Sequence, residues 1–322
     1  MSATPRAAAI TIGTRASALA RAQTESVVEL LAAAWPGLAC DVRPVVTQGD
    51  RTQASGQPLP EIGGKGLFTL ELERALSHRE IDLAVHSLKD LPTEEAPDIV
   101  IAAICLRGDA RDCLVARDGL MLAELPRGAV VGTSSLRREA QLRALRPDLT
   151  IRSIRGNVDT RVDKVRCGEY DATVLAAAGI ERLALGEAVT EWLDPDVMLP
   201  APGQGALAVQ CRVDDETTRR LLAAVDDPGA RAATTAERGF LAALGAGCSA
   251  PVGAHAGVAS PVSSDKVPQD MIRVSMNALV ASIDGSEVVR VGGEGEPEEL
   301  GSRLAREALA AGANRILEVI RG

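Results

Sequence analysis

The sequence has few of the residues that build metal sites and disulfide frameworks. Its 322 residues include three histidines and six cysteines, and no two cysteines form a Cys-x-x-Cys pair. Scattered thiols in a chain of this length are typical of a reducing compartment rather than of a disulfide-stapled secreted domain. Because protein-built zinc or iron sites need clustered ligands, we expect no bound metal.

Long hydrophobic runs are absent as well. The longest, residues 99–106, is far shorter than the roughly 20 residues that span a bilayer. No basic segment followed by an apolar stretch opens the sequence, so no secretion signal is expected. We therefore predict a cytoplasmic protein without a membrane partner.

Basic residues are outnumbered by acidic ones, and lysine is scarce among them. The formal net charge is −9, and only four of the 35 basic residues are lysines. An acidic chain is a poor candidate for nonspecific nucleic-acid binding, so we expect no nucleic-acid partner. Lys65 and Lys89 nevertheless stand in motif-like settings, where a compact ammonium group differs from an arginine fork.

A credible phosphate-binding loop is also missing. Residues 63–66 (GGKG) lack the Ser or Thr that follows a P-loop lysine, and residues 203–208 (GQGALA) follow prolines instead of a strand. Both segments are rejected as nucleotide sites, which argues against a nucleotide-dependent transferase.

What the sequence does contain is an alternation of short apolar strands and helices. This order is typical of α/β domains, with ligand sites in the loops that follow the strands. A Pro/Gly-rich crossing at residues 198–205 (MLPAPGQG) is predicted to be a hinge, and the pattern beyond residue 230 indicates a smaller α+β unit. The predicted strands are 7–12, 41–46, 83–86, 99–104, 112–116, 130–132, 150–154 and 171–176, and the predicted helices are 17–35, 67–77, 135–145, 158–167, 177–184 and 298–320.

Positive charge gathers between residues 137 and 166, which contain eight arginines and one lysine against four acidic residues. Arg137 and Arg138 fall in the first turn of a predicted helix, and Arg155 and Arg161 flank the next strand-to-helix loop. Helix N-termini and guanidinium forks bind carboxylates and phosphates, so we predict a ligand with several separate negative charges. The remaining arginines are expected to form a solvated basic face: Arg143, Arg146, Arg152 and Arg166.

Two further motifs carry reactive groups. Residues 86–92 (HSLKDLP) follow an apolar strand, which places Lys89 and Asp90 at a strand end. Asp90 is a turn residue before a proline, or a general acid–base group, or a carboxylate that stabilises a cationic intermediate, with Lys89 biasing its ionisation. Cys248 lies in a glycine-rich loop. A lone cysteine is usually a small buried hydrophobe, but a loop thiol that a ligand can approach forms covalent adducts.

Seven motifs together resemble the porphobilinogen deaminase (hydroxymethylbilane synthase) family. Each motif alone is unspecific, but they run in family order over nearly the whole chain. They are residues 13–17 (GTRAS), 63–68 (GGKGLF), 86–92 (HSLKDLP), 132–138 (GTSSLRR), 154–161 (IRGNVDTR), 199–206 (LPAPGQGA) and 245–251 (GAGCSAP).

The resemblance implies an α/β fold with two periplasmic-binding-protein-like (type II) domains and a smaller α+β C-terminal domain. Domain 1 would comprise residues 1–105 and 206–224, domain 2 residues 111–199, and domain 3 residues 230–322. The two α/β domains would hold the active site between them, and the third would carry the cofactor cysteine.

The implied reaction condenses four porphobilinogen molecules head to tail, with loss of ammonia, to the linear tetrapyrrole hydroxymethylbilane of haem biosynthesis. The implied cofactor is dipyrromethane, held by a thioether on Cys248. The partners would be porphobilinogen and the growing polypyrrole, which accumulates carboxylates and so matches the arginine block. We expect a monomer, because no sequence stripe indicates an interface.

The resemblance also assigns roles to individual residues. Asp90 would protonate the departing amine and stabilise pyrrole cations. A mobile lid would span residues 47–66, with Lys65 and Phe68 where this loop meets the helix after it. Cofactor contacts would come from Cys248, Lys89, Ser87, Ser135, Arg137, Arg138, Asp50 and Gly205, and substrate contacts from Arg15, Gln23, Arg155, Arg161 and Gln204.

The sequence departs from the family pattern at three positions. Ala16 and Ala18 replace the usual Gln and Pro of the first motif, and Leu70 stands where many members carry a lysine. One alternative function remains open, a non-catalytic binding protein that closes a hinge on a small anionic ligand. It would account for the arginines and the hinge, but not for the Cys248 loop or the Lys89-Asp90 pair.

Overall fold

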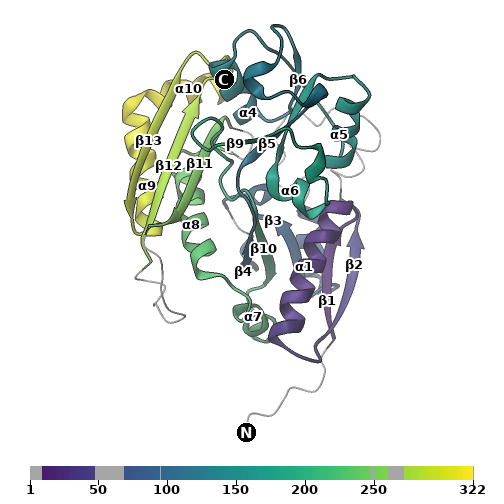
Figure 1. Ribbon diagram of the computed structural model, residues 1–322. Coiled ribbons are helices and arrows are strands. Elements are labelled where there is room, and N and C mark those ends of the chain that lie inside the picture. The colour runs from purple at the N-terminus through teal and green to yellow at the C-terminus, as the bar shows by residue number, and fades with distance from the viewer. Residues whose placement is uncertain (1–8, 48–68, 95, 248–249, 260–271, 322) are drawn as a thin grey trace. The chain divides into compact units, whose positions relative to one another are not determined.

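The computed structural model describes residues 9–47, 69–94, 96–247, 250–259 and 272–321, and its elements form three sheets (Figure 1). The chain divides into two compact units. Unit 1 comprises Met1–Arg107 and Ala206–Asp227, and unit 2 comprises Gly108–Gly205 and Pro228–Gly322. The division into three domains stays a prediction.

Unit 1 is built on one five-stranded sheet. Its elements are β1 (Ala9–Arg15), α1 (Ala18–Ala34), β2 (Ala39–Val45), α3 (Leu70–Ser77), β3 (Leu83–Ser87), β4 (Ile99–Arg107), β10 (Ala206–Arg212) and α7 (Glu216–Ala223). The strand order is β2-β1-β3-β10-β4, with β1 parallel to β2 and β3, and β10 antiparallel to its neighbours. Strand β10 is buried along its whole length, including its two polar residues, Gln210 and Arg212.

The start of unit 1 confirms one local prediction and corrects another. Ser17 caps α1, because its hydroxyl accepts the Ala20 N–H at 3.3 Å. The strand predicted at 7–12 extends to Arg15, which pairs with Val45 in β2. Arg15 is therefore the last residue of this strand, because parallel pairing with β2 satisfies the backbone that far.

Unit 2 contains the second five-stranded sheet. Its elements are β5 (Asp112–Ala116), β6 (Val130–Gly132), α4 (Leu136–Leu145), β7 (Thr150–Arg152), α5 (Val158–Arg166), β8 (Ala172–Ala176), α6 (Ala177–Arg182) and β9 (Glu191–Leu193), with short 3₁₀ turns at Arg117–Gly119, Leu122–Glu124 and Gly186–Ala188. The strand order is β7-β6-β8-β5-β9. Ser135 caps α4, and Asn157 stands at the N-cap position of α5 without a capping side-chain hydrogen bond.

The remainder of unit 2 is a three-stranded antiparallel sheet with helices packed on it. Its elements are α8 (Pro228–Ala243), β11 (Val252–Val258), β12 (Val274–Ala281), β13 (Val288–Gly295), α9 (Pro297–Ala308) and α10 (Asn314–Arg321). The core of this part contains Phe240, Met276 and Leu304. The helix predicted over 298–320 is interrupted by a π-helical turn at Leu309–Ala313. Two five-stranded α/β sheets and a smaller α+β part confirm the predicted fold class.

The crossing at residues 198–205 is fixed by buried hydrogen bonds within unit 2. The Leu199 N–H donates to Gln141 Oε1 in α4 at 2.8 Å. The Gly203 N–H donates to Oε2 of Glu237, a fully buried carboxylate in α8, at 2.7 Å. The crossing itself is thus tied to two helices of one unit, and its role as a hinge stays a prediction.

Candidate active site

The predicted site residues of unit 1 gather at one edge of its sheet. Arg15 ends β1 and Ser87 ends β3, and the carboxyl ends of these parallel neighbours meet at the same edge. Gln23, buried in α1, donates from Nε2 to Ser87 Oγ at 2.8 Å. The fold therefore brings Ser87 to the edge that holds Arg15 and Gln23, residues more than sixty positions earlier in the sequence.

Lys89 and Asp90 follow β3 directly, in a 3₁₀ turn at Leu88–Asp90. Leu88 is fully buried and anchors the turn, whereas Lys89 is half-buried and Asp90 is exposed. A carboxylate that stands exposed at a strand end can be reached by a ligand. This placement suits a group that exchanges protons with a substrate.

His86 is a buried titratable group beneath this edge that the sequence did not single out. It lies in β3, and burial together with the nearby charge of Arg15 lowers its pKa to about 4. Its ring is therefore neutral at pH 7. The signal in the sequence was its position between an apolar strand and the Ser87–Asp90 segment.

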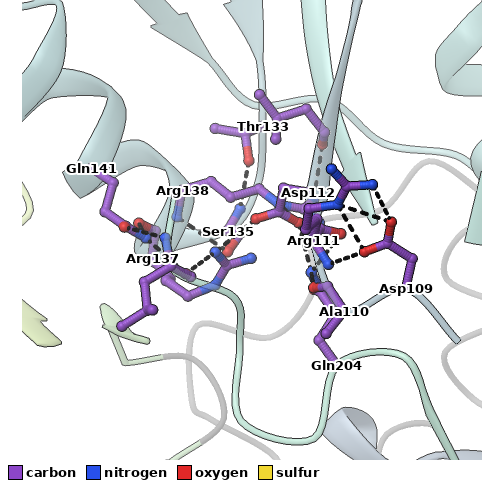
Figure 2. A network of polar contacts seen from close by, with 12 residues as sticks. Asp109, Ala110, Arg111, Asp112, Thr133, Ser135, Arg137, Arg138, Gln141 and Gln204 are labelled. Carbon is purple, nitrogen blue, oxygen red and sulfur yellow. Dashed lines mark hydrogen bonds and ion pairs between the residues drawn. The ribbon is translucent and has the colours of Figure 1, made fainter. Parts of the chain in front are cut away.

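In unit 2, Arg137 and Arg138 converge on one carboxylate, that of Asp112. Arg137 Nη1 donates to Asp112 Oδ2 at 2.8 Å, and Arg138 donates to Oδ1 from Nη2 at 2.8 Å and from Nε at 3.2 Å. The three side chains point toward one another in Figure 2. The exposed fraction is 4% for Arg137, 7% for Arg138 and 0% for Asp112. The two arginines predicted to bind ligand carboxylates thus already hold a carboxylate of the chain.

Asp112 is ionised in this setting. Burial alone would raise the pKa of Asp112, but the charges and hydrogen bonds of Arg137 and Arg138 outweigh it and hold that pKa well below its usual range. The sequence motifs did not single out Asp112. The available signal was a carboxylate at the first position of an otherwise apolar buried strand, DCLVA.

Gln204 and Gly205 join the same region. Gln204 is fully buried, and its Nε2 donates to Asp112 Oδ1 and to the Ala110 carbonyl, both at 2.8 Å. Gly205 has φ +86°, and a Cβ there would lie 2.6 Å from the Gly108 carbonyl oxygen. Only glycine fits this close passage of two chain segments. The contact of Gln204 with substrate and that of Gly205 with the cofactor stay predictions.

The loop between β7 and α5 adds two further arginines. Arg161 Nε donates to the Gly156 carbonyl at 2.8 Å. Burial and the charges of Arg138 and Arg155 lower the pKa of Arg161 to about 10. Gly156 has φ +119°, and a Cβ there would lie 2.7 Å from Thr160 Cγ2, so this loop requires glycine.

Unit 2 therefore holds a local surplus of positive charge. Arg137 and Arg138 bring two positive charges to one buried carboxylate, Asp112. Burial and the nearby charges of Arg138 and Arg155 lower the pKa of Arg161 to about 10. Arg137 Nε is buried and has no hydrogen-bond partner in the described part of the chain. An unmatched buried donor among clustered like charges indicates a negatively charged ligand.

The other arginines of the block have partners of their own inside unit 2. Arg143 pairs with Glu139 at 2.9 Å and Arg146 with Asp148 at 2.8 Å. The guanidinium of Arg152 lies 4.1 Å from the centre of the Tyr170 ring. Such contacts account for these side chains without a ligand. Arg166 pairs with Asp163 at 3.6 Å.

Four predicted site residues lie outside the described residues: Asp50, Lys65, Phe68 and Cys248. Within the ranges described above, no three His, Cys, Asp or Glu side chains gather in a way that could hold a metal ion. None of the described helices is both long enough and apolar enough to cross a membrane.

The arginine cluster fits a dipyrrole that bears several carboxylates. Its unmatched donor, Arg137 Nε, and its surplus charge are what such a group would satisfy. Ser135 lies in the same place, at the N-cap of α4, and adds a hydroxyl beside the helix N-terminus.

Comparison with known proteins identifies relatives over nearly the full length of the chain. A porphobilinogen deaminase from Roseiflexus castenholzii is 51% identical over 310 residues, covering 96% of this chain and 98% of that one. A porphobilinogen deaminase from Deinococcus radiodurans is 45% identical over 316 residues, covering 97% and 99%. Among solved structures, the VFT2 domain of Bordetella pertussis BvgS matches with a TM-score of 0.41 at 15% identity, covering 67% of this chain and 86% of that one.

Two family models match in sequence order. Residues 10–220 match the dipyrromethane cofactor binding domain of porphobilinogen deaminase, and residues 232–310 match its C-terminal domain. These matches confirm the expected cofactor, dipyrromethane, and overturn the alternative of a non-catalytic binding protein. The chain therefore belongs to the porphobilinogen deaminase family of enzymes.

Proposed function

We propose that this protein joins four porphobilinogen molecules head to tail and releases ammonia, giving hydroxymethylbilane. The observation that carries the proposal is the surplus of positive charge around Asp112, with its unmatched donor at Arg137 Nε. Each pyrrole unit bears an acetate and a propionate, so the growing chain is a polycarboxylate. A cluster of partly buried guanidinium groups is suited to such a ligand.

Asp90 is proposed as the acid–base group. It is exposed at the end of β3, where a substrate can approach, and Lys89 stands beside it in the same 3₁₀ turn. The carboxyl group would protonate the aminomethyl nitrogen as ammonia departs, and the resulting carboxylate would stabilise the positive charge left on the pyrrole.

Cys248 is proposed as the attachment point of the dipyrromethane cofactor. When bound, this group supplies the free pyrrole end to which the first substrate unit is joined. Residues 245–251 connect α8 to β11 in the sequence. These two elements are joined by a hydrogen bond in which buried Glu237 of α8 accepts the Ala256 N–H of β11 at 2.7 Å. The residues that would hold the cofactor besides Cys248 are Asp50, Ser87, Lys89, Ser135, Arg137, Arg138 and Gly205.

The substrate would be held by the residues around these groups. Arg155 and Arg161 offer guanidinium groups in unit 2, and Arg15 offers one at the strand edge of unit 1. Gln23 and Gln204 are the proposed amide contacts. Lys65 and Phe68 are proposed to belong to a lid, and the working form is proposed to be a cytoplasmic monomer.

Incubation of the purified protein with porphobilinogen tests the proposal. We expect four molecules of substrate to be consumed, and four of ammonia released, for each hydroxymethylbilane formed. A matched control is Cys167→Ser, which replaces an exposed cysteine of α5's C-terminal end and leaves the reaction unchanged. Folded wild-type protein that binds porphobilinogen but releases no ammonia would overturn the proposal.

A further inference from the structure

We propose that Asp112 is a positioning residue that sets the orientation of Arg137 and Arg138 toward the carboxylates of the bound polypyrrole. The inference rests on the proposed function. Asp112 itself is fully buried at the start of β5 and is not offered as a contact with the ligand. It acts through the two guanidinium groups.

The hydrogen bonds around Asp112 leave the two arginines in different states. Arg138 directs all three of its nitrogens to the protein, two to Asp112 and Nη1 to the Val174 carbonyl at 2.9 Å. Arg137 donates from Nη1 to Asp112 Oδ2 at 2.8 Å and to the Leu199 carbonyl at 2.7 Å. Its Nε stays buried and unmatched among the described residues. Arg137 is therefore the arginine of the pair that has a donor left for a ligand.

Asp112 also limits the charge of the site. Burial lowers the pKa of Arg137, Asp112 opposes this effect, and Arg138 reinforces it. With Asp112 present, the two guanidinium groups carry one net positive charge in a buried place. The single carboxylate thereby offsets the repulsion between two neighbouring buried guanidinium groups.

The same carboxylate connects the pair to the crossing segment. Asp112 Oδ1 accepts from Gln204, and Arg137 donates to Leu199, so both ends of residues 199–204 are tied to the cluster. A shift of Asp112 would move the donors on both sides. Small displacements of such supporting groups are enough to weaken ligand binding.

The first test compares Asp112→Asn with a matched control, Asp215→Asn. Asp215 pairs with Arg212, whose side chain is 7% exposed, at 2.6 Å in unit 1, so it also compensates a buried arginine. Intact mass gives the ratio of unmodified to dipyrrole-bearing protein, and kinetics give KM and kcat separately. We expect Asp112→Asn to raise that ratio and KM about tenfold each, and Asp215→Asn to leave both unchanged.

A second variant separates positioning from charge compensation. Asp112→Asn combined with Arg138→Gln restores the net charge of the cluster. We therefore expect this variant to fold even where Asp112→Asn alone does not. We expect its KM to exceed that of Arg138→Gln by about tenfold, because Arg137 has lost the acceptor that orients Nη1. Equal KM and equal cofactor occupancy in these two variants would overturn the proposal.

The outcome for the wild-type protein distinguishes this inference from the proposed function. Wild-type protein without a dipyrrole and without turnover contradicts the proposed function. Wild-type protein with both, alongside an Asp112→Asn variant of equal KM and occupancy, contradicts only the role of Asp112.

Discussion

The two units present their predicted site groups in opposite ways. In unit 1, Asp90 is exposed on a short turn beyond a strand end. In unit 2, Arg137 and Arg138 are buried and already bonded to Asp112. A group that exchanges a proton must reach its substrate, whereas groups that hold fixed charges work best when their orientation is set beforehand. By the proposed function, the same fold class would support a reactive edge in one unit and a pre-organised anion site in the other.

The largest effect is expected at the exposed edge. Asp90→Asn should lower kcat about 10³-fold, because the amide cannot deliver a proton or stabilise the cation. The melting temperature should stay close to that of the wild type, since the side chain is exposed. Near-normal turnover in this variant would show that Asp90 is not the acid–base group. The contrast between a reactive group in unit 1 and fixed charges in unit 2 would then not hold.

The anion site should respond through KM instead. Arg161→Gln should raise KM for porphobilinogen about tenfold. It should leave stability equal or higher, because burial and the charges of Arg138 and Arg155 already lower the pKa of Arg161. The control Arg143→Gln removes an arginine paired with Glu139 and should leave KM unchanged. A large loss of stability in Arg161→Gln with unchanged KM would mean that Arg161 stabilises the fold instead of binding substrate.

Gly205→Ala tests whether this predicted cofactor residue acts through the backbone. The added Cβ would meet the Gly108 carbonyl at 2.6 Å on a backbone with φ +86°. Denaturant unfolding should show a loss of about 2 kcal/mol or more. Gly186→Ala, where no atom lies within 4 Å of the added Cβ, should change stability by no more than about 0.5 kcal/mol. Equal stability of the two variants would contradict the close contact between Gly205 and the Gly108 carbonyl.

The last comparison concerns the pH dependence of stability. His86 stays neutral in the fold down to about pH 4, whereas in the unfolded chain it binds a proton near 6.5. Between these values the unfolded state binds more protons, so stability falls as the pH is lowered from 6.5 toward 4, by at most about 1.4 kcal/mol per pH unit. The groups facing the ring are Arg15 from β1 and Gln210 from β10.

Replacing the histidine isolates this contribution. His86→Leu should flatten the slope of stability against pH between 6.5 and 4, measured by urea unfolding at several pH values. His78→Gln, an exposed histidine, should leave the slope as in the wild type. An unchanged slope in His86→Leu would show that the ring is not held neutral by the fold.

Local features of the fold were predictable from the sequence. The Ser17 cap and the strand at 112–116 follow from hydroxyl placement and apolar runs, which depend on neighbouring residues only. The extent of β1 was not predictable in this way. Its last residues are held by pairing with β2, a contact between segments some thirty residues apart.

The candidate site shows the same limit more sharply. The arginine block pointed to an anionic ligand, and charge density together with the placement of arginines at predicted helix starts was enough for that inference. Burial of Arg137 and Arg138 on Asp112 joins β5 to α4, and sequence spacing gives no measure of such a pairing. The arginines of a binding cluster and those of a structural ion pair look alike until their partners are known.

The central claim is that the arginines around Asp112 hold a cofactor attached to Cys248. Mass spectrometry of the protein as isolated, with peptide mapping, tests it most directly. We expect two pyrrole units on the peptide that contains Cys248 in the wild type, and an unmodified peptide in the double variant Arg137→Gln/Arg138→Gln. Active wild-type protein with an unmodified Cys248, or a fully modified double variant, would contradict it.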